Sequence, residues 1–231
     1  MRFGTNGRGA TAVMGVAVAS TVWLFAQGES ASNRQTFLTI LNPNPASPAT
    51  VTAAFYNSTG KPVGNTTIVV DPLRRGTIKL NAVLPNASVA MVVTSTVPVV
   101  VERPLYSGPS NLDTVSAGED VFGRNGGSTT WLFPTGDVTG GDQLQLLVFN
   151  PSAKANNITA TFYTSLGTVI ERQLTVPANS ATQLAVNGIS GLATGTFGTM
   201  LKSTNGQLFV AERRTTNTAL GILDGTQGLA Q

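Results

Sequence analysis

The chain has 231 residues, of which only 11% are charged, and its formal net charge at pH 7 is +3. It contains no His and no Cys, which excludes imidazole acid–base chemistry, thiol nucleophiles and the soft ligands of zinc or iron–sulfur sites. The cations are scattered, whereas nucleic-acid binders concentrate Lys and Arg on one face. We therefore expect no enzymatic activity, no cofactor, no metal and no nucleic-acid partner.

Residues 1–20 are predicted to form an extended N-terminal strand. Val13, Val16 and Val18 lie in its middle, where small apolar side chains occupy both faces. A strand that is apolar on both faces needs a sheet edge to bury it. That edge is expected to come either from this chain or from a neighbouring molecule, by strand addition.

Two other interpretations of residues 1–20 stay open. The segment has features of a signal peptide, because Arg2 and Arg8 precede an apolar stretch. It could equally be the tail of an earlier unit. The signal peptide is disfavoured because its apolar stretch would run into the block around Trp23, and that block recurs in the interior of the chain.

Residues 21–106 are predicted to form a first β-sandwich. Apolar residues alternate with polar ones in short runs, and Gly, Pro, Asn and Ser separate the runs. About seven such runs in about 85 residues are typical of an immunoglobulin-like antiparallel sandwich. The last two runs, 89–93 and 97–101, are expected to form a hairpin around Ser95 and Thr96.

Residues 107–129 have the composition of a linker, 130–214 are predicted to form a second sandwich, and 215–231 a tail. Residues 203–206 contain Asn-Gly and are expected to form a hairpin turn, because this pair accepts positive φ. Residues 144–149 are apolar on both faces. This stretch predicts a second buried face, covered by a linker or by a neighbouring molecule.

The two predicted sandwiches are copies of one unit. Four blocks of the first unit return in the second with an offset of 107 to 110 residues: 21–29 as 129–137, 41–43 as 149–151, 54–60 as 161–167, and 100–103 as 210–213. A duplication of this size predicts one structural unit built twice.

Two kinds of recurring residue are expected to be structural. Trp23 and Trp131 are predicted to plug one end of each core, with a carbohydrate-stacking platform as the alternative. Asn42 and Asn150, each followed by Pro, are predicted to end a strand, because Asn bonds its own backbone in turns and Pro cannot donate to a ladder.

The pairs Glu102-Arg103 and Glu212-Arg213 close the last predicted strand of each unit. Neighbours on a strand point to opposite faces, so each side chain is expected to pair across strands or to cap a turn. A catalytic carboxylate is disfavoured, because glycosidase chemistry needs two acids and no second acid recurs nearby.

Calcium is the one metal for which weak candidate sites exist. Asp137 and Asp142 flank a Gly-rich loop, and Asp113, Glu119 and Asp120 form a second acidic group. Neither group has the spacing of a calcium-binding helix–loop–helix motif. We therefore predict no metal at either place.

The motifs Trp-Leu-Phe-Ala-Gln-Gly-Glu at 23–29, Asn-Pro at 42–43, Phe-Tyr at 55–56 and Val-Glu-Arg-Pro-Leu-Tyr at 101–106 resemble a family of bacterial extracellular β-sandwich repeats. In that family, W-[YL]-F-A-E-G opens each repeat and E-R-P-M-Y ends it. The resemblance covers both units and implies a secreted or surface-anchored protein without catalytic residues.

The second unit departs from this pattern at two places. Ala-Gln-Gly becomes Pro-Thr-Gly at 134–136, and Arg-Pro becomes Arg-Arg at 213–214. The second change suggests that the chain path after the second unit differs from the path after the first.

Together these features predict a structural extracellular protein that self-associates into a filament or surface layer, with copies of itself as partners and no membrane span. Strand addition through residues 1–20 is the suggested route. The alternative is an adhesin or a pair of carbohydrate-binding modules that recognises surface glycans through the two tryptophans or the loops around Asp137 and Asp142.

Overall fold

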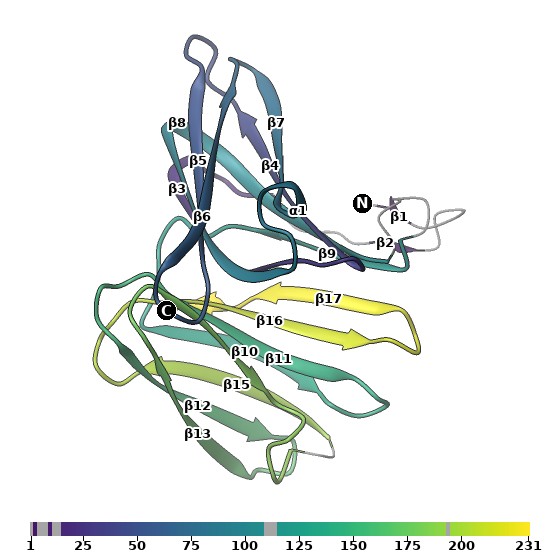
Figure 1. The fold of residues 1–231 in the computed structure, drawn as a ribbon. Coiled ribbons are helices and arrows are strands. Elements are labelled where there is room, and N and C mark those ends of the chain that lie inside the picture. Colours follow the sequence, from purple (N-terminus) through teal and green to yellow (C-terminus); the bar gives the residue numbers. More distant parts are fainter. Residues whose placement is uncertain (1, 4–8, 11–14, 109–114, 193–194) are drawn as a thin grey trace.

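The computed structural model describes residues 2–3, 9–10, 15–108, 115–192 and 195–231. The described elements are nearly all strands, with one short helix, α1 (Leu80–Val83). They form two β-sandwiches that lie one above the other (Figure 1). The prediction of an all-β protein with antiparallel sandwiches is confirmed.

The first sandwich contains seven strands, one of which is long enough to take part in both of its sheets. They are β3 (Ser20–Ser30), β4 (Arg34–Asn42), β5 (Ala49–Tyr56), β6 (Pro62–Val70), β7 (Arg74–Lys79), β8 (Ala87–Ser107) and β9 (Ala117–Phe122). The first half of β8 pairs with β5 and β3, and its second half pairs with β4 and β9. One strand therefore belongs to both layers.

The second sandwich has the same plan with the long strand divided. Its strands are β10 (Thr130–Asp137), β11 (Gln143–Asn150), β12 (Asn156–Thr164), β13 (Val169–Val176), β14 (Ser180–Ala185), β15 (Thr196–Ser203), β16 (Val210–Asn217), β17 (Ile222–Gln227) and β18 (Leu229–Ala230). The sheets have the orders β13-β12-β15-β10-β18 and β14-β11-β16-β17. β15 and β16 thus correspond to the two halves of β8.

Both predicted hairpins are wrong. Ser95 and Thr96 lie inside β8, which continues through them. In the second sandwich, β15 and β16 belong to different sheets, so residues 204–209 cross between the layers. Gly206 permits this crossing with a φ of 75°.

The ends of the units hold more strands than the sequence indicated. β9 lies in the predicted linker, and β17 and β18 lie in the predicted tail. β9 pairs with β8 as β17 pairs with β16. The expectation that the chain path diverges after the second unit is therefore wrong.

The N-terminal segment differs from the single extended strand that was expected. β1 (Arg2–Phe3) and β2 (Gly9–Ala10) pair with each other in antiparallel fashion, and β2 contacts β9. Val16 packs against the first core, whereas Val18 is 59% exposed. Val13 lies outside the described residues.

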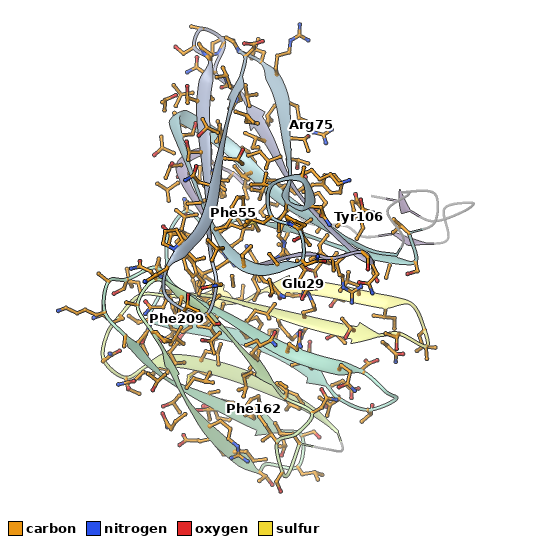
Figure 2. The ribbon with its side chains drawn as sticks, in the orientation of Figure 1. Glu29, Phe55, Arg75, Tyr106, Phe162 and Phe209 are labelled. Atoms are coloured by element: carbon orange, nitrogen blue, oxygen red, sulfur yellow. The ribbon has the colours of Figure 1, made fainter. Side chains whose placement is uncertain are left out.

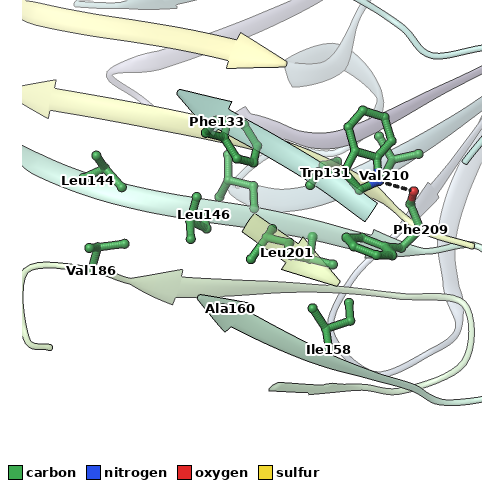
Figure 3. Close-up of a cluster of buried hydrophobic side chains, with 14 of the residues drawn as sticks. Trp131, Phe133, Leu144, Leu146, Ile158, Ala160, Val186, Leu201, Phe209 and Val210 are labelled. Carbon is green, nitrogen blue, oxygen red and sulfur yellow. Dashed lines mark hydrogen bonds between the residues drawn. The ribbon is translucent and has the colours of Figure 1, made fainter. Parts of the chain in front are cut away.

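Each core is closed by its tryptophan. The Trp131 indole is buried, and its Nε1 donates to the Phe209 carbonyl at 2.8 Å (Figure 3). The Trp23 indole is buried in the first core and donates to the Val99 carbonyl at 2.9 Å. Because both rings are enclosed and both N–H groups are paired, neither ring face is open to a sugar.

The recurring Phe-x-x-Gly block forms a β-bulge in both units. The register shifts between Phe25 and Gly28 and again between Phe133 and Gly136. A Cβ on Gly28 would lie 2.8 Å from the terminal methyl group of Met91, so a larger residue at this bulge would force the Met91 side chain to move. The bulge leaves the two residues between Phe and Gly without ladder partners.

In the part of the chain that the structure describes, no helix has the length and apolar character needed to cross a membrane.

Candidate functional site: the interface between the two sandwiches

The first sandwich covers an apolar face of the second. Leu147 and Phe149 of β11 point away from their own core, yet they are only 3% and 1% exposed. The Tyr56 ring packs against Phe149 with their centroids 5.6 Å apart. Leu24 and Ala26 of β3 belong to the same buried cluster. The apolar character of both faces of β11 is therefore explained by a contact within the chain.

A buried ionic cluster completes this interface. It contains three carboxylates and three guanidinium groups, contributed by five strands of both sandwiches: Glu29, Arg34, Arg103, Glu119, Glu212 and Arg214. The side chains of Arg103, Glu119, Glu212 and Arg214 are almost fully buried, while Glu29 and Arg34 form the partly exposed rim. Figure 2 shows Glu29 where the two sandwiches meet.

Arg103 connects three segments. Its Nη2 lies 2.8 Å from Glu119 Oε1, and its Nη1 lies 2.9 Å from Glu212 Oε2 on the second sandwich. Nη1 also donates to the Gln27 carbonyl, in the bulge of β3. The other oxygen of Glu212 accepts the Ala26 N–H at 2.8 Å, the second backbone group that the bulge exposes. The bulge therefore creates the polar socket that receives Glu212.

Arg214 makes the reciprocal contact from the second sandwich. Its Nη2 and Nε bond the two oxygens of Glu119 at 2.8 and 3.2 Å, and its Nη1 bonds Glu29 at 2.8 Å. Such bidentate pairs fix orientation as well as distance. Position 214 is also where the second unit departs from its repeated motif.

The pKa values of this cluster follow from opposing effects. Burial alone would raise the pKa of Glu119, but Arg214 and Arg103 outweigh it and hold the pKa below its usual range. Burial would likewise lower the pKa of Arg214, but Glu119 and Glu29 raise it above its usual value. Both groups therefore stay charged, which is consistent with a fixed structural contact.

The geometry around Arg103 is repeated at the far end of the second sandwich. Arg213 Nη1 donates to the Thr135 carbonyl, and Thr135 occupies the bulge position that Gln27 holds in the first unit. Arg213 Nη2 also lies 3.7 Å from Asp224 Oδ2. β17 pairs with β16 as β9 pairs with β8, so Asp224 stands where Glu119 stands.

The outer face of the first sandwich holds a separate polar group around Glu102. Thr39 Oγ1 donates to Glu102 Oε2 at 3.1 Å. Burial and a hydrogen bond with Glu102 raise the pKa of Asp120 to about 8, so the Asp120 carboxyl is mostly protonated at neutral pH. A hollow of about 450 Å³ beside them is lined by Phe37, Arg75 and Tyr106 among others. Figure 2 labels Arg75 and Tyr106 on the first sandwich.

The candidate calcium groups do not assemble. Asp137 Oδ1 accepts the Thr139 N–H at 2.7 Å, and Asp142 Oδ1 accepts the Asn217 amide at 2.8 Å. Asp113 lies outside the described residues, and the oxygens of Glu119 are occupied by arginines. The described part of the chain contains no group of three or more His, Cys, Asp or Glu placed to hold a metal ion.

Of the charged residues singled out from sequence, Arg103 and Glu212 meet at the interface, whereas Glu102 and Arg213 lie away from it. Each pairs across strands or layers, as the alternation of strand faces indicated. Glu29, Arg34 and Arg214 were not predicted to lie at an interface, and Glu119 was considered only as a calcium ligand. Only Arg214 left a signal, because it breaks the repeated Arg-Pro motif.

Comparison with solved structures finds weak likenesses. The protein in the crystal structure of Thermotoga maritima 1070 shares 18% sequence identity with this chain, with a TM-score of 0.40. The match covers 46% of this chain and 94% of that chain. The Anabaena sensory rhodopsin transducer is 25% identical with a TM-score of 0.33, covering 38% of this chain and 99% of that chain. A Bacteroides uniformis beta-glucuronidase is 14% identical with a TM-score of 0.17; the match covers 84% of this chain but only 24% of the enzyme chain.

These TM-scores are too low for any property of those proteins to be transferred to the chain. No curated protein sequence matches it. The match to a protein-family model is extensive, since it spans residues 4–224. The chain therefore belongs to DUF5719, a family of unknown function.

Proposed function

We propose that the chain is a structural protein of the cell exterior that docks β-sandwich units rigidly on one another and self-associates into a filament or surface layer. The observation that carries this proposal is the buried ionic cluster between the sandwiches. Interfaces between domains of one chain are usually modest and polar, and they permit relative motion. Here the charges of Arg103 and Arg214 are desolvated and paired across the interface, so any reorientation would leave buried charges unpaired.

The proposed location rests on composition and on the motif resemblance. The low content of charged residues and the absence of Cys and His suit a stable β-protein outside the cell. The opening and closing motifs resemble those of extracellular repeats. A rigid pair of such units is suited to transmitting position and force between neighbours rather than to chemical turnover.

Sedimentation velocity of the purified chain over a wide concentration range, with negative-stain electron microscopy, tests this function. We expect the weight-average mass to rise with concentration and linear or planar assemblies to form. A variant lacking residues 1–14 tests whether strand addition is the route. If it is, this variant should stay monomeric at concentrations at which the full chain assembles. Isolated particles of the full chain at every concentration would refute the proposed function.

A glycan-binding role is the second candidate. It is favoured by a hollow of about 350 Å³ between the sandwiches, whose lining includes Asn57, Ser58 and Gln183. Amide and hydroxyl groups of this kind pair with sugar hydroxyls. Calorimetric titration with a panel of cell-surface oligosaccharides tests it, with Gln183→Ala as the variant expected to lose binding.

A further inference from the structure

The contact between the two sandwiches is made by two surfaces, one on each sandwich. Because the chain is duplicated, a counterpart of each surface occurs on the other sandwich, where it takes no part in this contact. We propose that the outer face of the first sandwich receives the free end of the second sandwich of another copy, in the geometry that joins the two sandwiches within the chain. This inference rests on the proposed function and identifies the surfaces that would carry it.

The receiving face is defined by strand register. β4, β7, β8 and β9 of the first sandwich correspond to β11, β14, β16 and β17 of the second. Leu41 pairs with Val100 as Phe149 pairs with Val210, so Leu41 is the counterpart of Phe149. Phe149 is covered by Tyr56, whereas Leu41 is 47% exposed. The first sandwich thus presents an uncovered version of a face that is buried in the second.

The carboxylate of this face also has its counterpart. Thr39 pairs with Glu102 as Leu147 pairs with Glu212, which makes Glu102 the equivalent of Glu212. Glu212 binds a guanidinium from the neighbouring sandwich. Among the described residues, no ion pair joins Glu102 to an arginine; it accepts a hydrogen bond from Thr39 and lies beside Asp120.

The inserting surface is repeated at the far end of the second sandwich. Arg213 bonds the Thr135 carbonyl as Arg103 bonds the Gln27 carbonyl. Tyr163 follows Phe162 as Tyr56 follows Phe55, and its ring is 46% exposed. A hollow of about 260 Å³ occupies the place where the first unit receives Glu212. Its lining contains Arg213 and Thr135 and also the carboxylates of Asp137, Asp142 and Asp224.

Superposing the internal contact on these surfaces pairs Glu102 of one copy with Arg213 of the next. It also lays Tyr163 on Leu41, as Tyr56 lies on Phe149. One ion pair and one apolar contact therefore form in the same arrangement, against the repulsion of the three aspartates that also line the hollow. Because the two surfaces differ, the contact is heterologous and repeats head to tail into an open filament rather than closing as a dimer.

Two residues make the contact between copies weaker than the contact within the chain. Pro134 replaces Ala26, so the backbone N–H that bonds Glu212 has no equivalent. Pro104 replaces Arg214, so the guanidinium that bonds Glu119 and Glu29 is also missing. The expected association is therefore reversible and depends on concentration.

Thiol crosslinking tests this arrangement, because the chain has no Cys to interfere. Leu41→Cys and Tyr163→Cys both alter exposed side chains. We expect a short bismaleimide to join the two single variants into a dimer when they are mixed, while each variant alone stays uncrosslinked. The double variant should give a ladder of oligomers. Thr67→Cys, exposed on β6 and outside the receiving face, mixed with Tyr163→Cys is the matched control.

Exchanging the charges of Glu102 and Arg213 provides a second test, which needs no crosslinking reagent. Glu102→Arg should weaken self-association at least tenfold in sedimentation velocity, and mixing it with Arg213→Glu should restore binding between the two variants.

The outcomes separate this inference from the proposed function. Assembly of the wild-type chain without crosslinking between positions 41 and 163 above the control would overturn the inference and leave the structural role standing. Crosslinking of Leu41→Cys with itself would also overturn it, because the contact would then be symmetric. A wild-type chain that stays monomeric at every concentration, with no crosslink, would refute both.

Discussion

Replacing Arg214 with Met tests whether the ionic cluster holds the two sandwiches together. Met preserves most of the buried apolar stem but removes three hydrogen bonds, two to Glu119 and one to Glu29. The cluster then contains two guanidinium groups against three carboxylates. Glu119 keeps Arg103 as its partner at 2.8 Å.

The expected loss in the free energy of unfolding follows from this imbalance of charges. Removing one partner of a buried ion pair costs about 3–5 kcal/mol, and because Glu119 keeps Arg103, we expect Arg214→Met to cost about 3 kcal/mol. Adding Glu119→Gln makes the cluster neutral again, with two charges of each sign. The double variant should therefore be more stable than Arg214→Met alone, with a coupling free energy of about 2 kcal/mol.

Denaturant unfolding followed by tryptophan fluorescence measures these changes in each sandwich separately, because Trp23 lies in the first core and Trp131 in the second. Single-tryptophan backgrounds assign each transition to its sandwich. Arg74→Met is the matched control, since Arg74 is exposed at the start of β7, and it should change the free energy of unfolding by less than about 0.5 kcal/mol. If Arg214→Met cost no more than this control, the cluster would not determine the stability of the interface.

Four further substitutions test other parts of the structure. Asn42→Ala and Asn150→Ala each remove an amide that donates to three backbone carbonyls, so thermal unfolding should show losses of about 2–4 kcal/mol in both; a loss in only one would contradict their equivalence. Asp120→Asn should flatten the pH dependence of stability: the pKa of Asp120 is raised from 3.8 to about 8 on folding, so its contribution is full below pH 4 and is lost as pH rises through 8. The slope is at most about 1.4 kcal/mol per pH unit and is reduced by solvent that reaches Asp120; an unchanged pH profile would refute the raised pKa of Asp120. Tyr56→Ala should lower the free energy of unfolding by about 1–2 kcal/mol through lost packing on Phe149, and chemical denaturation with equal midpoints would contradict it.

Much of the fold was predictable from sequence, because the signals are local. Alternation of apolar residues indicated the strands, and the duplicated blocks indicated that one plan occurs twice. The role of Asn42 and Asn150 could also be read, since an Asn before Pro at a strand end bonds nearby backbone. These features depend on a few neighbouring residues, and each occurs in both repeats of the sequence.

The connection between the last two apolar runs of each unit was not predictable from the same signals. Ser95 and Thr96 separate two apolar runs, but neither residue favours the positive φ of a two-residue turn. The backbone therefore continues through them as β8. At the equivalent point of the second unit, Gly206 adopts positive φ and the strand is interrupted. The apolar runs were read correctly, and the connection between them was not.

The ionic cluster could not be found by spacing, because its members are far apart in the chain. The N–H of Ala26 and the carboxylate of Glu212 are separated by 186 positions. Within a strand, an isolated Glu or Arg has the pattern of an exposed face. Only the packing of one sandwich on the other removes these side chains from water, and the resemblance to extracellular repeats carries no information on that packing.

The differences between the two copies mark the interface. Residues that build the sandwich are kept in both units, including both tryptophans, both bulge glycines and the arginine that bonds the bulge carbonyl. Ala26 and Arg214 are used only where the sandwiches meet, and their counterparts, Pro134 and Pro104, can make neither contact. In a duplicated chain, identity between copies therefore reports the fold, and departure from it reports the contact between units. If Pro104→Arg and Pro134→Ala complete the second contact, the double variant should self-associate more tightly than the wild-type chain; sedimentation velocity showing equal or weaker association would refute that equivalence.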